Sequence, residues 1–269
     1  MNENPYQAPS AELDLPAPEL GELHAPRGVE SGRGMAWFRE GWQLIMKAPL
    51  AFGLMSLVFL LLWGLVSLVP ILGGLALVLF WPHAMAGFYR AAARARLDEQ
   101  VTVGILFEPF SDVGRLLGVG GLYLLGSVLL MLVALLGLGM SGMFAMFSGG
   151  EMDPATMEFD ATGFTFLLTM LLVLALSIPY MMAFLFAPVL VDRHNLKAME
   201  AVKLSLRACL RNIMPFLIWG LVWFGVWILV GILTLIPLLG ALILIAMVLA
   251  MVPLSVCSLL VAYEDIFVK

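Results

Sequence analysis

Charged residues are scarce in this sequence: Asp, Glu, Lys and Arg make up only 12% of its 269 residues, whereas 62% are hydrophobic. A soluble domain carries about 25% charged residues, and a single soluble core stops growing near roughly 250–300 residues. The apolar side chains are therefore too many for one soluble core, and a bilayer must solvate them. The net charge of −5 also argues against nucleic acid as a partner.

Cysteine and histidine are rare as well, with two and three residues. Cys209 and Cys257 form no disulfide framework, so we expect two free thiols. The histidines His24, His83 and His194 stand far apart, with no Cys or carboxylate at ligand spacing, so we predict no metal and no other cofactor. The HExxH, GxSxG, CxxC and Walker patterns are missing too, which predicts a protein that is not an enzyme.

Long apolar runs are what the sequence has in abundance. Six runs of about 20 residues or more are each long enough to cross roughly 30 Å of hydrocarbon. We therefore predict an all-α polytopic membrane bundle of six transmembrane helices in three hairpins, with short amphipathic interfacial helices beside them. The predicted spans are about 49–69, 70–89, 116–140, 164–191, 215–236 and 237–263.

All 14 Lys and Arg residues fall on one side of this scheme, between the hairpins or at the chain ends. The positive-inside rule then predicts that both termini are cytoplasmic. The spans contain no Asp, Glu, Lys or Arg deep in their interiors, and His83 is the nearest case. This absence argues against a proton-coupled pump or an ion channel with a charged filter.

Two kinds of polar segment flank the spans. Residues 1–33 are acidic and Pro-rich, so we predict a disordered cytoplasmic segment that precedes a membrane domain over residues 34–269. The stretch 35–47 has helical amphipathic spacing and should lie in the membrane interface, with Trp37 and Trp42 at headgroup depth. Its expected apolar face consists of Met35, Phe38, Trp42, Ile45 and Met46.

A second amphipathic stretch covers residues 197–211 and carries four basic side chains. Lys197, Lys203, Arg207 and Arg211 are candidate contacts for anionic lipid headgroups, because each basic residue near an anionic surface contributes about 1 kcal/mol. Positive-inside topology alone is the alternative explanation of these charges.

The first and last hairpins resemble each other. SLVPILGG from Ser67 matches TLIPLLGA from Thr234, and each hairpin follows an amphipathic stretch. The match favours an internal duplication with parallel topology; the alternative is that Pro and Gly are simply common in membrane helices. Pro82, Pro179 and Pro253 lie in the second span of the three hairpins, where we predict helix kinks.

Three carboxylates end spans four and six. Asp192, Glu264 and Asp265 could pair with Arg90 or Arg115 as an acid/base site at the predicted cytoplasmic face. The ordinary interpretation is that they are helix-end charges at the headgroup boundary.

Two parts of the chain resemble known sequences. Asn4-Pro5-Tyr6-Gln7-Ala8-Pro9 resembles a short motif at the start of several bacterial membrane-protein families. GWQLIMKAP, PILGG, AVKLSLRACLRNIMPF and the proline-bearing sixth span resemble uncharacterised six-span bacterial inner-membrane proteins. Those proteins are in turn similar to the membrane domain of some glycerophosphodiester phosphodiesterases. The resemblance implies an inner-membrane location and no reaction, because no phosphodiesterase catalytic domain is found in this sequence.

The sequence favours a non-enzymatic inner-membrane protein with an accessory, assembly or envelope-homeostasis role. Asn4, Pro5, Tyr6 and Pro9 would then form a motif for a membrane-protein partner, in addition to contacts with the lipid bilayer. The alternative is a carrier or flippase of a lipid or an uncharged solute. A weaker alternative is a membrane enzyme that acts on lipid headgroups.

Overall fold

The structure is a computed structural model that describes residues 21–148, 161–236 and 239–268. These ranges are almost wholly helical and contain no strand. The helices are α1 (Arg33–Lys47), α2 (Pro49–Ser67), α3 (Leu72–Arg96), η1 (Val103–Asp112), α4 (Val113–Ser148), α5 (Ala161–Leu185), α6 (Ala187–His194), α7 (Ala198–Arg211), α8 (Ile213–Leu233), α9 (Leu239–Tyr263) and η2 (Glu264–Val268).

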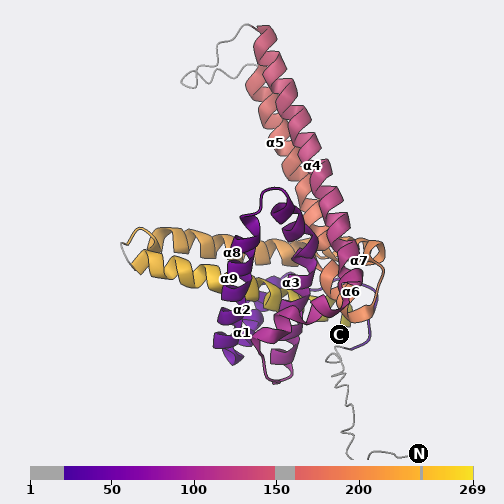
Figure 1. The fold of residues 1–269 in the computed structure, drawn as a ribbon, viewed down its shortest axis with the longest axis vertical. Coiled ribbons are helices and arrows are strands. Elements are labelled where there is room, and N and C mark those ends of the chain that lie inside the picture. Colours follow the sequence, from indigo (N-terminus) through magenta and orange to yellow (C-terminus); the bar gives the residue numbers. More distant parts are fainter. Residues whose placement is uncertain (1–20, 149–160, 237–238, 269) are drawn as a thin grey trace, which may run out of the picture.

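Within the described ranges, six helical segments are long and apolar enough to cross a membrane, as the sequence predicts. They form the hairpins α2/α3, α4/α5 and α8/α9. Figure 1 shows α4 and α5 running side by side away from the rest of the chain, while α8 and α9 project in another direction. The all-α polytopic bundle is therefore confirmed.

Burial is concentrated at one end of the molecule, which we call the base. The base consists of α1, η1, α6, α7, η2 and the ends of the long helices that adjoin them. Beyond the base the hairpins expose most of their apolar side chains: the most apolar stretch of α4 is only 11% buried. Side chains that no other helix covers must meet lipid, so hydrocarbon solvates the outer parts of the hairpins.

Two short helices pack on the hairpin that precedes them, and α1, which precedes all three hairpins, packs on the last one. Helix η1 packs mainly on α2/α3, α7 on α4/α5, and α1 on α8/α9 at the other end of the chain. The chain therefore consists of three units, each an amphipathic helix followed by a hairpin, and their contacts form a closed ring. The sequence indicated the first and third of these units; the second escapes notice because η1 is a short 3-10 helix.

The first and third hairpins share the bonding of their turns. The hydroxyls of Ser67 and Thr234 each donate a 2.7 Å hydrogen bond to the carbonyl three residues earlier. The backbone N–H groups of Gly73 and Gly240 each donate to the carbonyl four residues earlier, at 2.9 and 2.8 Å. This shared geometry supports the duplication.

Helix α1 buries a face that overlaps only partly with the predicted apolar face, since Ile45 is buried and Phe38 packs against the core. Its buried residues are Gly34, Trp37, Gly41, Leu44 and Ile45. Met35, Trp42 and Met46 of the expected apolar face are about half exposed. The amphipathic pattern counts large apolar side chains and takes no account of glycine. In the structure, the two glycines let the α1 backbone approach α8 and α9 closely. Trp37 is fully buried against other helices, and its depth relative to the headgroups stays a prediction.

Gly41→Ala is expected to destabilise the fold by about 1–3 kcal/mol, because the new methyl group would lie 2.6 Å from the Ser258 backbone nitrogen and overpack this contact. Gly53→Ala in α2 is the matched control, since nothing lies within 4 Å of the added methyl group. There the loss of backbone freedom in the unfolded chain should stabilise by about 0.5–1 kcal/mol. Thermal unfolding in detergent measures both; equal shifts would contradict the close packing of α1 on α9.

The predicted fourth span consists of two helices. Helix α5 ends at Leu185 and α6 begins at Ala187, with the break at Phe186. Ser205 of α7 accepts a 3.0 Å hydrogen bond from the Phe186 N–H and donates a 2.7 Å bond to the Met182 carbonyl. The hydroxyl thus satisfies backbone groups that the break leaves open.

Pro82, Pro179 and Pro253 all lie inside continuous helices, namely α3, α5 and α9. Their position in the second helix of each hairpin is as expected. The kinks at these prolines stay a prediction.

Candidate functional site

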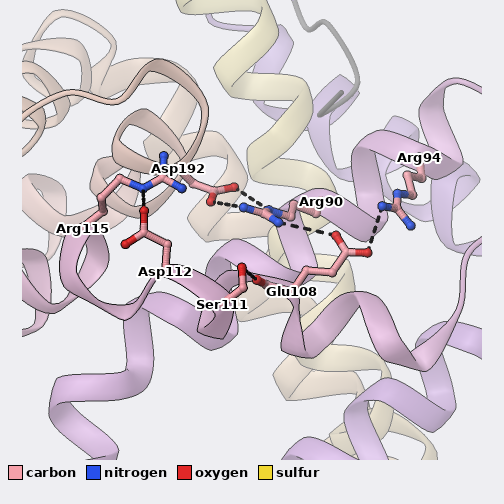
Figure 2. Close-up of polar contacts among 7 residues, drawn as sticks. All are labelled: Arg90, Arg94, Glu108, Ser111, Asp112, Arg115 and Asp192. Atoms are coloured by element: carbon pink, nitrogen blue, oxygen red, sulfur yellow. Dashed lines mark hydrogen bonds and ion pairs between the residues drawn. The ribbon is translucent and has the colours of Figure 1, made fainter. Parts of the chain in front are cut away.

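A network of two arginines and two carboxylates joins α3, α6 and η1 (Figure 2). Arg90 binds Asp192 through two bonds, Nε to Oδ2 at 2.9 Å and Nη2 to Oδ1 at 2.7 Å. Glu108 bridges Arg90 at 3.5 Å and Arg94 at 2.9 Å. The Asp192 side chain is only 4% exposed. Bidentate pairing of this kind is strong and fixes the relative orientation of the helices.

A second network surrounds the end of the chain. The Asp265 carboxylate accepts hydrogen bonds from Arg33 Nε at 2.6 Å and from Trp37 Nε1 at 2.8 Å. Glu264 pairs with Arg96 at 3.0 Å. Burial by itself would lower the pKa of Arg33, but its bonds and charge attraction to Asp265 and Glu40 outweigh that effect and raise it. Arg33 therefore stays charged, and α1 is tied to η2.

The three carboxylates proposed from the sequence as an acid/base site each pair with a different arginine. Asp192 pairs with Arg90, one of its two expected partners, while Glu264 and Asp265 belong to the second network. Arg115 pairs instead with the exposed Asp112, at 2.6 Å. An arginine holds each of the three carboxylates, an arrangement typical of structural ion pairs.

Sequence reasoning missed Glu108, Arg33 and Trp37. A usable signal existed for Glu108, because Arg90 and Arg94 lie one turn apart at the end of an apolar helix and so call for an acidic partner. Trp37 and Arg33 carry no such signal, since their partner Asp265 is 228 residues from Trp37 in the chain.

The residues just before α1 are bound to the base as an extended segment. We call residues 24–29 the N-terminal strap. His24 and Arg27 donate backbone N–H bonds to the carbonyls of Phe267 and Ile266, at 2.8 and 3.1 Å. Arg27 Nε donates to the Asp265 carbonyl at 2.6 Å. These residues belong to the segment that we predicted to be disordered; backbone hydrogen bonds and the partly buried Val29 hold them against the base.

Asn212, between α7 and α8, holds the strap from the other side. Its Oδ1 accepts a 2.8 Å bond from the Val29 N–H, and its Nδ2 donates a 2.9 Å bond to the Arg27 carbonyl. Asn212 is only 1% exposed, so this pairing takes place inside the protein. The candidate partner motif Asn4, Pro5, Tyr6 and Pro9 lies outside the described residues.

The four basic candidates on and beside α7 are all exposed: Lys197, Lys203, Arg207 and Arg211. Arg211 also donates a 3.0 Å bond to the Pro26 carbonyl and so helps to hold the strap. Lys203 and Arg207 face outward on α7, opposite the buried Ala201, Ser205 and Ala208. Their binding of anionic lipid stays a prediction.

A pocket of about 430 Å³ lies between α2, α3 and η1. It is lined only by Phe, Trp, Leu, Val and Ala side chains. Its aromatic residues are Phe59, Trp63, Phe80, Trp81, Phe107 and Phe110.

The two cysteines are both free and lie in the packed core, and burial raises the pKa of Cys209 to about 12.

Beside the apolar pocket, His83 is fully buried near the middle of α3. Its ring packs against Phe80 and Phe110, and its Nε2 lies 3.1 Å from the Val113 carbonyl. The contact with Val113 joins α3 to the start of α4. In the described part of the chain, no three His, Cys, Asp or Glu side chains gather as a metal site would require.

Comparison with known proteins identifies one clear relative. The chain is 33% identical over 198 residues to a probable inner membrane protein of Burkholderia thailandensis, covering 72% of this chain and 73% of that protein. The chain belongs to the family of that protein. It is thus a multi-pass membrane protein of a bacterial inner-membrane family, which agrees with its six apolar helical segments.

No family model and no solved structure matches the chain. The similarity of this inner-membrane protein to the membrane domain of glycerophosphodiester phosphodiesterases stays a prediction. So does the meaning of the motif at residues 4–9.

Proposed function

We propose that this protein is a non-enzymatic accessory factor of the inner membrane, with an assembly or envelope-homeostasis role, that recruits a membrane-protein partner through the motif formed by Asn4, Pro5, Tyr6 and Pro9. Both termini lie in the cytoplasm in this proposal. The observation that carries it is the strap: hydrogen bonds to Asn212 and to the carbonyls of Ile266 and Phe267 hold residues 24–29 against the base. These bonds therefore fix the place of the strap on the base.

The charged networks support the same proposal. Arg90, Arg94 and Arg33 bind carboxylates of this chain, so they stabilise a rigid base. By contrast, Lys203 and Arg207 are exposed on α7. A rigid base with an exposed basic face and a tethered N-terminal segment suits a docking platform that rests on anionic headgroups.

Deleting residues 2–12 is expected to remove one or more proteins from those that co-purify in mild detergent. Tyr6→Ala alone should remove the same proteins, since an aromatic side chain between two prolines is the expected anchor. The matched control is Leu15→Ala, a truncation in the same segment outside the motif. Quantitative mass spectrometry measures the result. An unchanged set of co-purifying proteins after the deletion would refute the role of the segment.

One observation favours the carrier or flippase as a second candidate. The apolar pocket between α2, α3 and η1 has room for part of a lipid. Flipping of fluorescent phospholipid by the protein in vesicles, at a rate above that of protein-free vesicles, would favour this candidate over the accessory role.

A further inference from the structure

The pocket between α2, α3 and η1 has walls without polar chemistry. Two of its three sides are the membrane-spanning helices α2 and α3, and every residue that lines it is Phe, Trp, Leu, Val or Ala. Phe80 and Phe107 line it while remaining 37% and 45% exposed. Such walls offer almost nothing to a headgroup, a sugar or water. They fit a hydrocarbon ligand.

Small residues on α3 create the space. Ala76 and Ala84 face the pocket. Counting from the equivalent turn glycines Gly73 and Gly240, the related helix α9 carries Ile243 and Met251 at these two positions. The first hairpin thus lacks two large side chains that its counterpart in the same chain possesses. Aromatic contacts such as Trp63 with Trp81, at a centroid distance of 5.7 Å, hold the helices beside the gap.

The volume decides which apolar ligand fits. A methylene group is about as large as a water molecule, whose share of liquid volume is about 30 Å³, so 430 Å³ holds on the order of a dozen methylenes. That is most of one fatty-acyl chain. An α-helix about 10 Å across would fill the same volume with roughly one turn, too little contact for a helix of a partner or of a second copy.

We propose that this pocket binds one acyl chain of a bilayer phospholipid as a fixed component of the protein. The acyl chain would pack between α2 and α3, with Phe107 and Phe110 of η1 on the third side. The bound acyl chain would cover aromatic side chains that the protein itself leaves exposed. This inference does not depend on the proposed recruitment of a partner.

The test uses the full chain in nanodiscs of phosphatidylethanolamine and phosphatidylglycerol with a trace of a phosphatidylethanolamine that carries a photoreactive diazirine in one acyl chain. Mass spectrometry locates the cross-links. A bound chain should label Trp63 and Phe107 several-fold more than Leu171 and Leu174 of α5, which are exposed to lipid outside any described pocket. Labelling that follows exposure alone at all four residues would overturn the proposal.

The double variant Ala76→Ile with Ala84→Met fills the pocket with the side chains that α9 carries. It should reduce labelling of Trp63 and Phe107 several-fold and leave that of Leu171 unchanged. The matched control, Ala175→Ile, adds the same bulk as Ala76→Ile to the exposed face of α5 and should change neither. Ala76→Ile alone serves if the double variant does not fold. Undiminished labelling in a filled variant that melts at the wild-type temperature would also refute the bound chain.

Discussion

Arg90→Leu should destabilise the protein by about 3–5 kcal/mol, the usual cost of removing one partner of a buried ion pair. The loss leaves the Asp192 carboxylate, only 4% exposed, without its bidentate partner in the base. For a protein of this size the melting temperature should fall by roughly 6 to 20 °C. Thermal unfolding in detergent, followed by tryptophan fluorescence, measures the change.

The matched control lies in the same region of Figure 2. Arg115 and Asp112 are 2.6 Å apart, but their side chains are 39% and 54% exposed. Arg115→Leu should therefore change stability by no more than about 0.5–1 kcal/mol. The double variant Arg90→Leu with Asp192→Leu should recover much of the loss, because it removes the Asp192 carboxylate together with its bidentate partner. Equal effects of Arg90→Leu and Arg115→Leu would contradict the buried network.

Asp265→Ala is expected to release the first helix of the chain from its last residues. The substitution removes the acceptor for Arg33 and for Trp37 Nε1, at a cost of about 3–5 kcal/mol. Limited digestion with trypsin should detect the release at Arg33, which is protected while α1 stays bound. We expect rapid cleavage at Arg33 in the variant and slow cleavage in the wild type. Cleavage at Arg27 should not change, because the strap keeps its bonds to backbone carbonyls and to Asn212.

Asp98→Asn provides the comparison for this experiment, because Asn also tolerates the left-handed backbone of this position (φ 58°). Lys47 and Asp98 are 2.7 Å apart, but the Asp98 side chain is 79% exposed, so the loss should be within about 0.5 kcal/mol. Trypsin should cut this variant at Arg33 as slowly as the wild type. Rapid cleavage in both variants would show that Asp265 has no special part in holding the N-terminal region.

The sequence predicts the spans well because their signal is local. A run of about 20 apolar residues is sufficient evidence of a membrane helix, and all six predicted spans fall on long apolar helical segments. The approximate limits of the amphipathic helices follow from the same kind of local pattern. The turn at residues 67–74 and its counterpart at 234–241 also reveal the repeat.

What the sequence could not supply depends on distant partners. The buried face of α1 is decided by Gly41 against Ser258 and by Trp37 against Asp265, contacts between opposite ends of the chain. The ordering of the strap depends on Asn212, an unremarkable polar residue between two helices. The pocket arises from Ala76 and Ala84. Alanine is common in membrane helices, so these two residues give no sequence signal of a pocket.

The closed ring of helix-on-hairpin contacts also dictates an order of biosynthesis. Helix α1 is synthesised before α8 and α9, which together form its binding site. The bonded residues Trp37 and Asp265 are 228 residues apart in the sequence. At 5–20 residues per second, translation separates the two by roughly 10 to 45 seconds. Throughout that interval α1 must wait at the membrane surface, where exposed Trp42 and Met46 can rest in the headgroup layer. If translation ends before the last hairpin is made, α1 therefore has no α8 and α9 to bind.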